Sequence, residues 1–218
     1  MKANFIPILL TMFFAGLPGL KAGEVSIVEY LEDPGFEASH EAKQQINAPD
    51  VKELNGWNAI PAGGNFWTSV SYVDANGTSL GDNREAIKPA EGKSYLRMYT
   101  EKSSDWLALR TPMFELKNDS TYVISFKVAV DTQPVMARLD VGLRGAKGDY
   151  YGLKSYDLAS LEPGWSTVVY RHHYTGPDQP GALQITGRRE AAKTAGSLNF
   201  DDFKTPTEND VSLIPTEH

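Results

Sequence analysis

One segment near the middle of the chain constrains the fold more than any other feature. Between residues 121 and 131, apolar side chains recur at every second position: Tyr122, Ile124, Phe126, Val128 and Val130. A period of two places them all on one face of a β-strand. We therefore expect a long strand with one face buried in a hydrophobic core.

The same alternation recurs elsewhere in the chain. Residues 137–144 place Leu139, Val141 and Leu143 on one face, and residues 94–101 place Leu96 and Met98 inward. Further candidate strands span residues 25–30, 107–110, 167–174, 182–187 and 197–204. No apolar pattern of helical period extends over three turns. Eight or more short strands, separated by clusters of Gly, Pro, Asn and Asp, indicate an all-β sandwich or barrel.

The first 22 residues have the pattern of a secretory signal peptide. A short basic start precedes an apolar stretch at residues 5–20, which Pro7 and Pro18 interrupt, and polar sequence begins at Lys21. Cleavage after Ala22 would release an exported protein, either secreted or periplasmic. The alternative is an N-terminal membrane anchor. However, the stretch is short for a span of about 20 residues, so we expect no membrane span after signal removal.

Charge and cysteine content exclude several classes of function. The 218 residues include 28 acidic and 21 basic side chains, a net charge of −7, and no cysteine. A nucleic-acid partner is not expected, because a protein that binds nucleic acid needs an excess of basic side chains on one face. The absence of cysteine excludes disulfides, thiolate metal sites and cysteine nucleophiles. We expect one domain over residues 23–204, followed by a poorly ordered C-terminal tail, residues 205–218, which has two prolines and no alternation.

Short motifs at the two ends of the domain are the most specific feature of the sequence. Residues 33–37 read Asp-Pro-Gly-Phe-Glu, and residues 196–203 read Gly-Ser-Leu-Asn-Phe-Asp-Asp-Phe. Between them lie residues 91–97, Glu-Gly-Lys-Ser-Tyr-Leu-Arg, and the pair Gly164-Trp165. In this order the motifs resemble the galactose-binding-like β-sandwich, and within it the carbohydrate-binding modules of families four and nine.

The resemblance covers about residues 25–204 and carries several implications. It implies an all-β, two-sheet antiparallel jelly-roll sandwich that binds a polysaccharide or oligosaccharide without catalysis. Together with the alternation, it predicts a core that contains Tyr122, Ile124, Phe126, Val128, Leu139, Val141, Trp165 and Phe200.

The resemblance also implies a structural calcium ion where the two chain ends meet. Carried over to this sequence, the side-chain ligands are Glu37 and either Asp201 or Asp202, and a backbone carbonyl near Lys93 is a further ligand. Calcium prefers such hard oxygen ligands, in sets of six to eight. The alternative is that Asp201 and Asp202 flank the end of a strand in solvent.

Sugar binding requires flat aromatic faces and a few fixed polar groups. Two aromatic pairs are candidates for exposed platforms: Trp67 with Tyr72, in a long segment rich in Gly and Asn, and Tyr150 with Tyr151. Tyr99 joins them, because alternation turns it outward. For any one of these side chains, burial in the core is the alternative.

The outward positions of the predicted strands carry a second group of candidate binding residues. They are Arg97, Tyr99, Arg138, Asp140, Arg144, Gln184 and Arg188. Arginine pairs bidentately with carboxylate or sulfate, so these four arginines on an acidic chain favour an anionic glycan. The alternative is a solvated face held by ion pairs such as that between Arg138 and Asp140.

Catalytic signatures are few. No nucleophile elbow, zinc-binding helix or phosphate loop occurs, and alternation sends His172 and His173 to opposite faces of one strand. A small jelly-roll polysaccharide lyase or hydrolase is one alternative function, and for a lyase His173, Tyr99 and Arg138 are the candidate residues. An exported structural or adhesive protein on the same fold is another.

Overall fold

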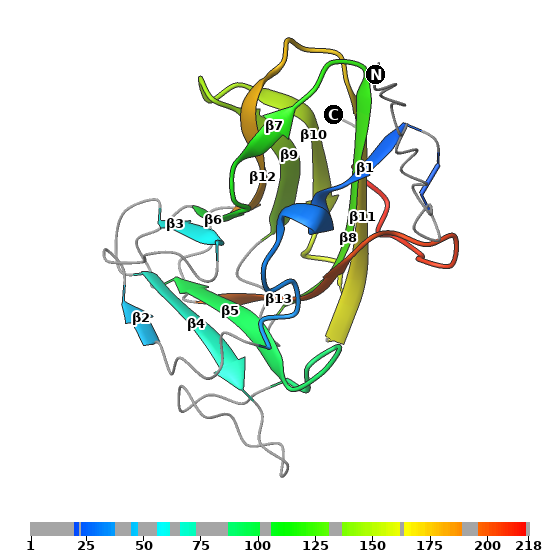
Figure 1. The fold of residues 1–218 in the computed structure, drawn as a ribbon. Helices are drawn as coiled ribbons and strands as arrows, with labels where there is room; N and C mark the ends of the chain where they lie inside the picture. The colour runs from blue at the N-terminus through cyan, green and yellow to red at the C-terminus, as the bar shows by residue number, and fades with distance from the viewer. Residues whose placement is uncertain are drawn as a thin grey trace, which may run out of the picture.

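The computed structural model describes residues 20–21, 23–37, 45–47, 56–61, 66–72, 87–100, 106–130, 137–161, 164–188 and 196–216. These residues form 13 β-strands and one short 3-10 helix, η1 (Ile27–Tyr30). The strands make two sheets that face each other across a common core (Figure 1).

The first sheet has seven strands. Its order is β1-β8-β13-β5-β4-β2, and β11 also pairs with β8. The bounds are β1 (Glu24–Ser26), β8 (Ser120–Val130), β13 (Gly196–Lys204), β5 (Ser94–Thr100), β4 (Phe66–Tyr72), β2 (Gln45–Asn47) and β11 (Gly164–Tyr174). All pairs are antiparallel except β1 with β8, which is parallel.

The second sheet has six strands and is antiparallel throughout. Its order is β10-β9-β12-β6-β3, and β7 also pairs with β12. The bounds are β10 (Tyr150–Asp157), β9 (Arg138–Gly145), β12 (Gln179–Arg188), β6 (Trp106–Arg110), β3 (Asn58–Pro61) and β7 (Phe114–Leu116). Together the two sheets confirm the predicted two-sheet antiparallel sandwich.

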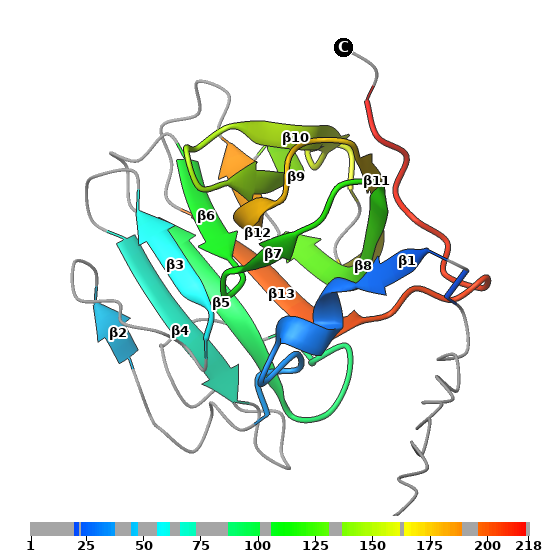
Figure 2. The same cartoon turned by 45° about the horizontal axis from the view of Figure 1, so that its top comes forward.

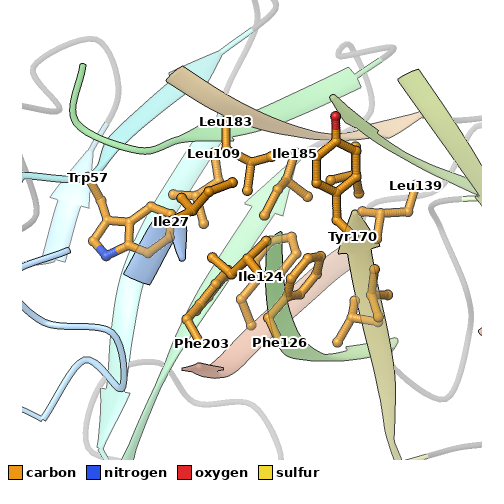
Figure 3. Close-up of a cluster of buried hydrophobic side chains, with 14 of the residues drawn as sticks. Ile27, Trp57, Leu109, Ile124, Phe126, Leu139, Tyr170, Leu183, Ile185 and Phe203 are labelled. Atoms are coloured by element: carbon orange, nitrogen blue, oxygen red, sulfur yellow. The ribbon is translucent and has the colours of Figure 1, made fainter. Parts of the chain in front are cut away.

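The core lies where the inward positions of both sheets meet. Figure 3 shows Ile124 and Phe126 of β8 opposite Leu109, Leu183 and Ile185 of the second sheet. Seven of the eight predicted core residues are buried: Tyr122, Ile124, Phe126, Val128, Leu139, Val141 and Phe200. The period-two pattern therefore identified the inward faces of β8 and β9 correctly.

Trp165 was expected in the core, and this prediction was wrong. In β11 the inward positions are Val168 and Tyr170, so Trp165 lies on the opposite face of the strand. Its Nε1 donates a 2.7 Å hydrogen bond to the backbone carbonyl of Lys88, and its ring meets Tyr95 edge-on. The indole thus packs against the outer surface of the first sheet.

The C-terminal segment, residues 205–216, makes backbone contacts with both sheets. The backbone N–H of Leu213 donates to Thr167 of β11, and the backbone N–H of Thr216 donates to Ser155 of β10. Leu213 also packs against the core. The segment therefore bridges the edge strands of the two sheets, and Figure 2 shows it in red beside β11. Sequence alternation did not predict these backbone contacts.

The predicted signal peptide lies almost wholly outside the described residues, which begin at residue 20. Within the described part of the chain, no helix is both long and apolar enough to cross a membrane.

Candidate functional site

The outer face of the second sheet carries most of the predicted binding residues. On β9 and β12 the side chains of Leu139, Val141, Leu143, Leu183 and Ile185 enter the core. The alternate positions therefore face away from it: Arg138, Asp140, Arg144, Gln184, Thr186 and Arg188. Pairing of β12 with β9 places Arg188 opposite Arg138 and Thr186 opposite Asp140.

A hydrogen-bonded group centred on Gln184 occupies the middle of this face. Its Oε1 accepts hydrogen bonds from Arg110 Nη2 at 2.7 Å and from Arg144 Nη1 at 3.0 Å. Its Nε2 donates to the hydroxyl of Tyr150 and to Thr186 Oγ1. Four strands, β6, β9, β10 and β12, contribute to this group, so the sheet fixes the position of each side chain.

Tyr150 provides the aromatic surface of the group. Its side chain is 38% exposed, and Arg144 Cζ lies 5.4 Å from the centroid of its ring. Its neighbour Tyr151 points the other way, because it packs edge-on against the buried ring of Tyr174. Of this predicted pair, only Tyr150 lies on the outer face.

The buried carboxylate of Asp140 anchors a second group on the same face. It is 3% exposed and forms ion pairs with Arg138, at 2.9 Å, and with Arg188. Ser155 of β10 donates a 2.7 Å hydrogen bond to Asp140 Oδ1. The predicted pair of Arg138 and Asp140 is thus present, with a second arginine added.

The other predicted binding residues lie on the first sheet. Arg97 is buried at 3% exposure, on the side of β5 opposite the core residues Leu96 and Met98. Trp67 and Tyr99 are opposed in the β4–β5 pair, and Tyr72 ends β4. The side chains of Trp67, Tyr72 and Tyr99 lie outside the described part of the structure. Their backbones lie on β4 and β5 of the first sheet, whereas the Gln184 group is formed by strands of the second sheet.

Arg110 is the functional candidate that sequence reasoning missed. It ends β6 and stands opposite Gln184 in the pairing of β12 with β6. Leu107 and Leu109 are buried, so the same alternation that placed the other arginines outward also turns Arg110 outward. Burial, and then the adjacent Arg144, lower the pKa of Arg110.

The predicted calcium ligands meet at one short segment, residues 90–94. Glu37 Oε1 accepts hydrogen bonds from the backbone N–H groups of Lys93 and Ser94, at 2.7 and 2.9 Å. Gly92 has a φ of +54°, and a Cβ there would lie 2.2 Å from Glu37 Oε1, so a larger residue would strain the backbone and displace the Glu37 carboxylate. Asp201 Oδ2 accepts from Ala90 and Glu91, at 2.8 and 3.1 Å.

Carboxylates, the ligand type that calcium prefers, reach this segment from both chain ends, and the backbone groups that meet them are N–H donors. Asp201 is fully buried, and burial raises the pKa of its carboxyl group to about 6. Three backbone hydrogen bonds to the carboxylate lower the pKa, but the effect of burial is larger. Asp202 instead pairs with Lys204 at 2.7 Å. Among the described residues, no three His, Asp or Glu side chains gather to hold a metal. An ion here would need carbonyl or water ligands as well, and calcium stays a prediction.

The residues considered for a lyase do not converge. His173 of β11, on the first sheet, contacts Asp119 at 3.2 Å and Thr121 at 3.1 Å. Arg138 lies on β9 of the second sheet. His172 lies on the other face of β11 from His173, against Gly152, where a Cβ would lie 2.1 Å from the imidazole.

Comparison with solved structures supports the fold. An arabinose-bound GH51 α-L-arabinofuranosidase matches 80% of this chain and 25% of its own length, with 17% identity and a TM-score of 0.54. A CBM4 module matches 80% of this chain and 97% of its own, with 18% identity and a TM-score of 0.47. A CBM61 module in complex with β-1,4-galactotriose matches 82% and 98%, with 16% identity and a TM-score of 0.43.

No protein-family model and no curated protein matches the sequence. The chain spans only a quarter of the arabinofuranosidase, so that likeness concerns one part of the enzyme's fold.

Proposed function

We propose that this chain is an exported, non-catalytic carbohydrate-binding protein that recognises a polysaccharide on the outer face of its second sheet. The Gln184 group carries the proposal. It combines an exposed tyrosine ring with guanidinium, amide and hydroxyl groups that the sheet holds in place. Aromatic faces pack against sugar rings, and fixed polar groups pair with hydroxyls.

The hydrogen bonds within the group support binding over a purely structural role. Gln184 is 3% exposed, so its amide is fixed, whereas Tyr150 and the two arginines reach the surface. Donors that a fixed amide already orients lose less entropy when a ligand binds. The resemblance of the sequence motifs to carbohydrate-binding modules supports the same reading.

Two finer points belong to this proposal. Four arginines on the face, Arg110, Arg138, Arg144 and Arg188, favour an anionic polysaccharide on a chain whose net charge is −7. A calcium ion at Glu37 and Asp201 would join the two ends of the domain and take no part in chemistry.

A glycan array tests the function directly. The expected result is that the purified mature protein retains a polysaccharide without releasing new reducing or unsaturated ends. Release of such ends would instead show the lyase or hydrolase. Failure to bind any glycan would contradict the proposal and favour a structural or adhesive role.

A further inference from the structure

A small pocket opens beside the Gln184 group. It lies between the turn that joins β9 to β10 and the residues that follow β6, and its volume is about 220 Å³. Arg110, Arg144 and Lys147 line it together with the apolar side chains of Met113 and Ala182. Thus three of the side chains around this pocket are cations and none is acidic.

The two arginines share an acceptor that carries no charge. Both donate to Oε1 of Gln184, a neutral amide. Within the described part of the chain, neither arginine pairs with a carboxylate. Adjacent guanidinium groups repel each other, and partial burial strengthens the repulsion. The lowered pKa of Arg110, caused by burial and by Arg144, agrees with this arrangement. An anion between them would relieve the repulsion.

Several other cations of the described residues have acidic partners. Arg138 and Arg188 share Asp140, Arg171 pairs with Glu24, and Lys204 pairs with Asp202. The net charge of Asp140, Arg138 and Arg188 together is therefore +1. The net charge of the side chains that line the pocket is +3. The uncompensated positive charge of this face is concentrated at the pocket.

The size of the pocket limits what can enter it. Pockets for whole small-molecule ligands span about 300–1,000 Å³. A pocket of 220 Å³ suits a substituent, and guanidinium groups match the oxygens of a sulfate or carboxylate. We propose that this pocket binds the charged substituent, a sulfate ester or a uronate carboxylate, of the polysaccharide that lies on the adjacent face. This inference rests on the proposed function.

The test measures the ratio of charged-ligand to neutral-ligand affinity by calorimetry. The ligands are a neutral galactan, a carrageenan as the sulfated galactan, and polygalacturonate as the uronate polymer. The proteins are the wild type, the double variant Arg110→Gln with Arg144→Gln, and the control Arg171→Gln. The control removes a half-exposed arginine of the first sheet that is already paired with Glu24.

The wild type should prefer one of the two charged polymers, and which one identifies the substituent. In the double variant, the ratio of charged-ligand to neutral-ligand affinity should fall at least tenfold. In the control, this ratio should equal that of the wild type. The wild-type preference should also shrink in 0.5 M salt. An unchanged ratio in the double variant, or no preference in the wild type, overturns the inference.

Melting curves with charged monosaccharides separate this inference from the proposed function. Galactose 6-sulfate and galacturonate at millimolar concentration should raise the melting temperature of the wild type, but not that of the double variant. If this occurs while no polysaccharide binds, the pocket stands as an anion site and the proposed function fails. If neither the charged monosaccharides nor the charged polymers bind while the array identifies a neutral glycan, the pocket inference fails and the proposed function stands.

Discussion

The carboxylate of Asp201 accepts a 2.8 Å hydrogen bond from the backbone N–H of Ala90, although 111 residues separate them in the chain. Glu37 holds the same segment from the other end of the domain, through Lys93 and Ser94. Both chain ends are therefore tied to residues 90–94. The proposed calcium ion would act at this junction.

Calcium removal is the first prediction. Because the ion would bind only the folded state, saturating calcium should stabilise the protein by about 2.7 kcal/mol at a hundredfold excess over the dissociation constant. We expect a chelator to lower the melting temperature of the wild type. The variant Asp201→Asn should melt at the same temperature with and without calcium. A wild-type melting curve that a chelator leaves unchanged would exclude the site.

The pH dependence of stability, measured with chelator present, is the second prediction. Burial raises the pKa of Asp201 from 3.8 to about 6, so the folded state binds this proton more tightly than the unfolded state. Its contribution is fully present below about pH 3.8 and is lost as the pH rises through 6. Between pH 7 and 4.5, the wild type should therefore gain stability relative to Asp201→Asn in urea denaturation. If the difference in stability between the wild type and Asp201→Asn stayed constant over this pH range, the pKa of Asp201 would not be raised.

Asp140 provides the third prediction. The variant Asp140→Asn leaves Arg138 and Arg188 adjacent without a counter-charge, and we expect it to cost about 1–3 kcal/mol in urea denaturation. High salt should restore part of the loss by screening the two arginines. Glu208→Gln, at an exposed position of the C-terminal segment, serves as the control and should change stability by less than about 0.5 kcal/mol. Equal effects of the two variants would contradict the role given to Asp140.

The C-terminal segment provides the fourth prediction. Leu213 packs against the core, whereas Ile214, the next residue, is 86% exposed. Leu213→Ala should lower the free energy of unfolding by about 1–2 kcal/mol, because it removes partly buried apolar surface. Ile214→Ala should leave it within about 0.5 kcal/mol. If the two matched variants are equally stable, the segment does not brace the sandwich.

Much of the fold could be predicted from the sequence, because alternation is a local signal. The pattern over residues 121–131 gave the inward face of β8, and the pattern over residues 137–144 put Arg138, Asp140 and Arg144 on one outer face. In the structure, Glu37 and Asp201 of the two end motifs both bind the segment of residues 90–94, and a metal there stays a prediction.

The remaining features depend on tertiary contacts that alternation does not encode. Alternation turned Arg97 away from the core, but that outer face of the first sheet is itself buried around Tyr95 and Asn199. Arg110 and Gln184 are 74 residues apart, and only the pairing of β6 with β12 brings them together. The position of residues 205–216 depends on backbone hydrogen bonds to β10 and β11, which alternation does not encode.

If the Gln184 face binds a polysaccharide, the exposed ring of Tyr150 should contribute to the affinity, which variants of Tyr150 can measure. Stacking on an aromatic ring is worth about 1–3 kcal/mol for nucleobases, and a sugar ring should gain no more. Tyr150→Ala should therefore weaken binding by about ten- to hundredfold.

Tyr150→Phe keeps the ring and is the matched control, with little expected loss of affinity. Both variants should melt within a few degrees of the wild type, since Tyr150 is 38% exposed. The measurement is calorimetric titration of all three proteins with the polysaccharide that the array identifies. Only Tyr150→Ala should lose affinity strongly, and equal affinity of Tyr150→Ala and the wild type would contradict polysaccharide binding on this face.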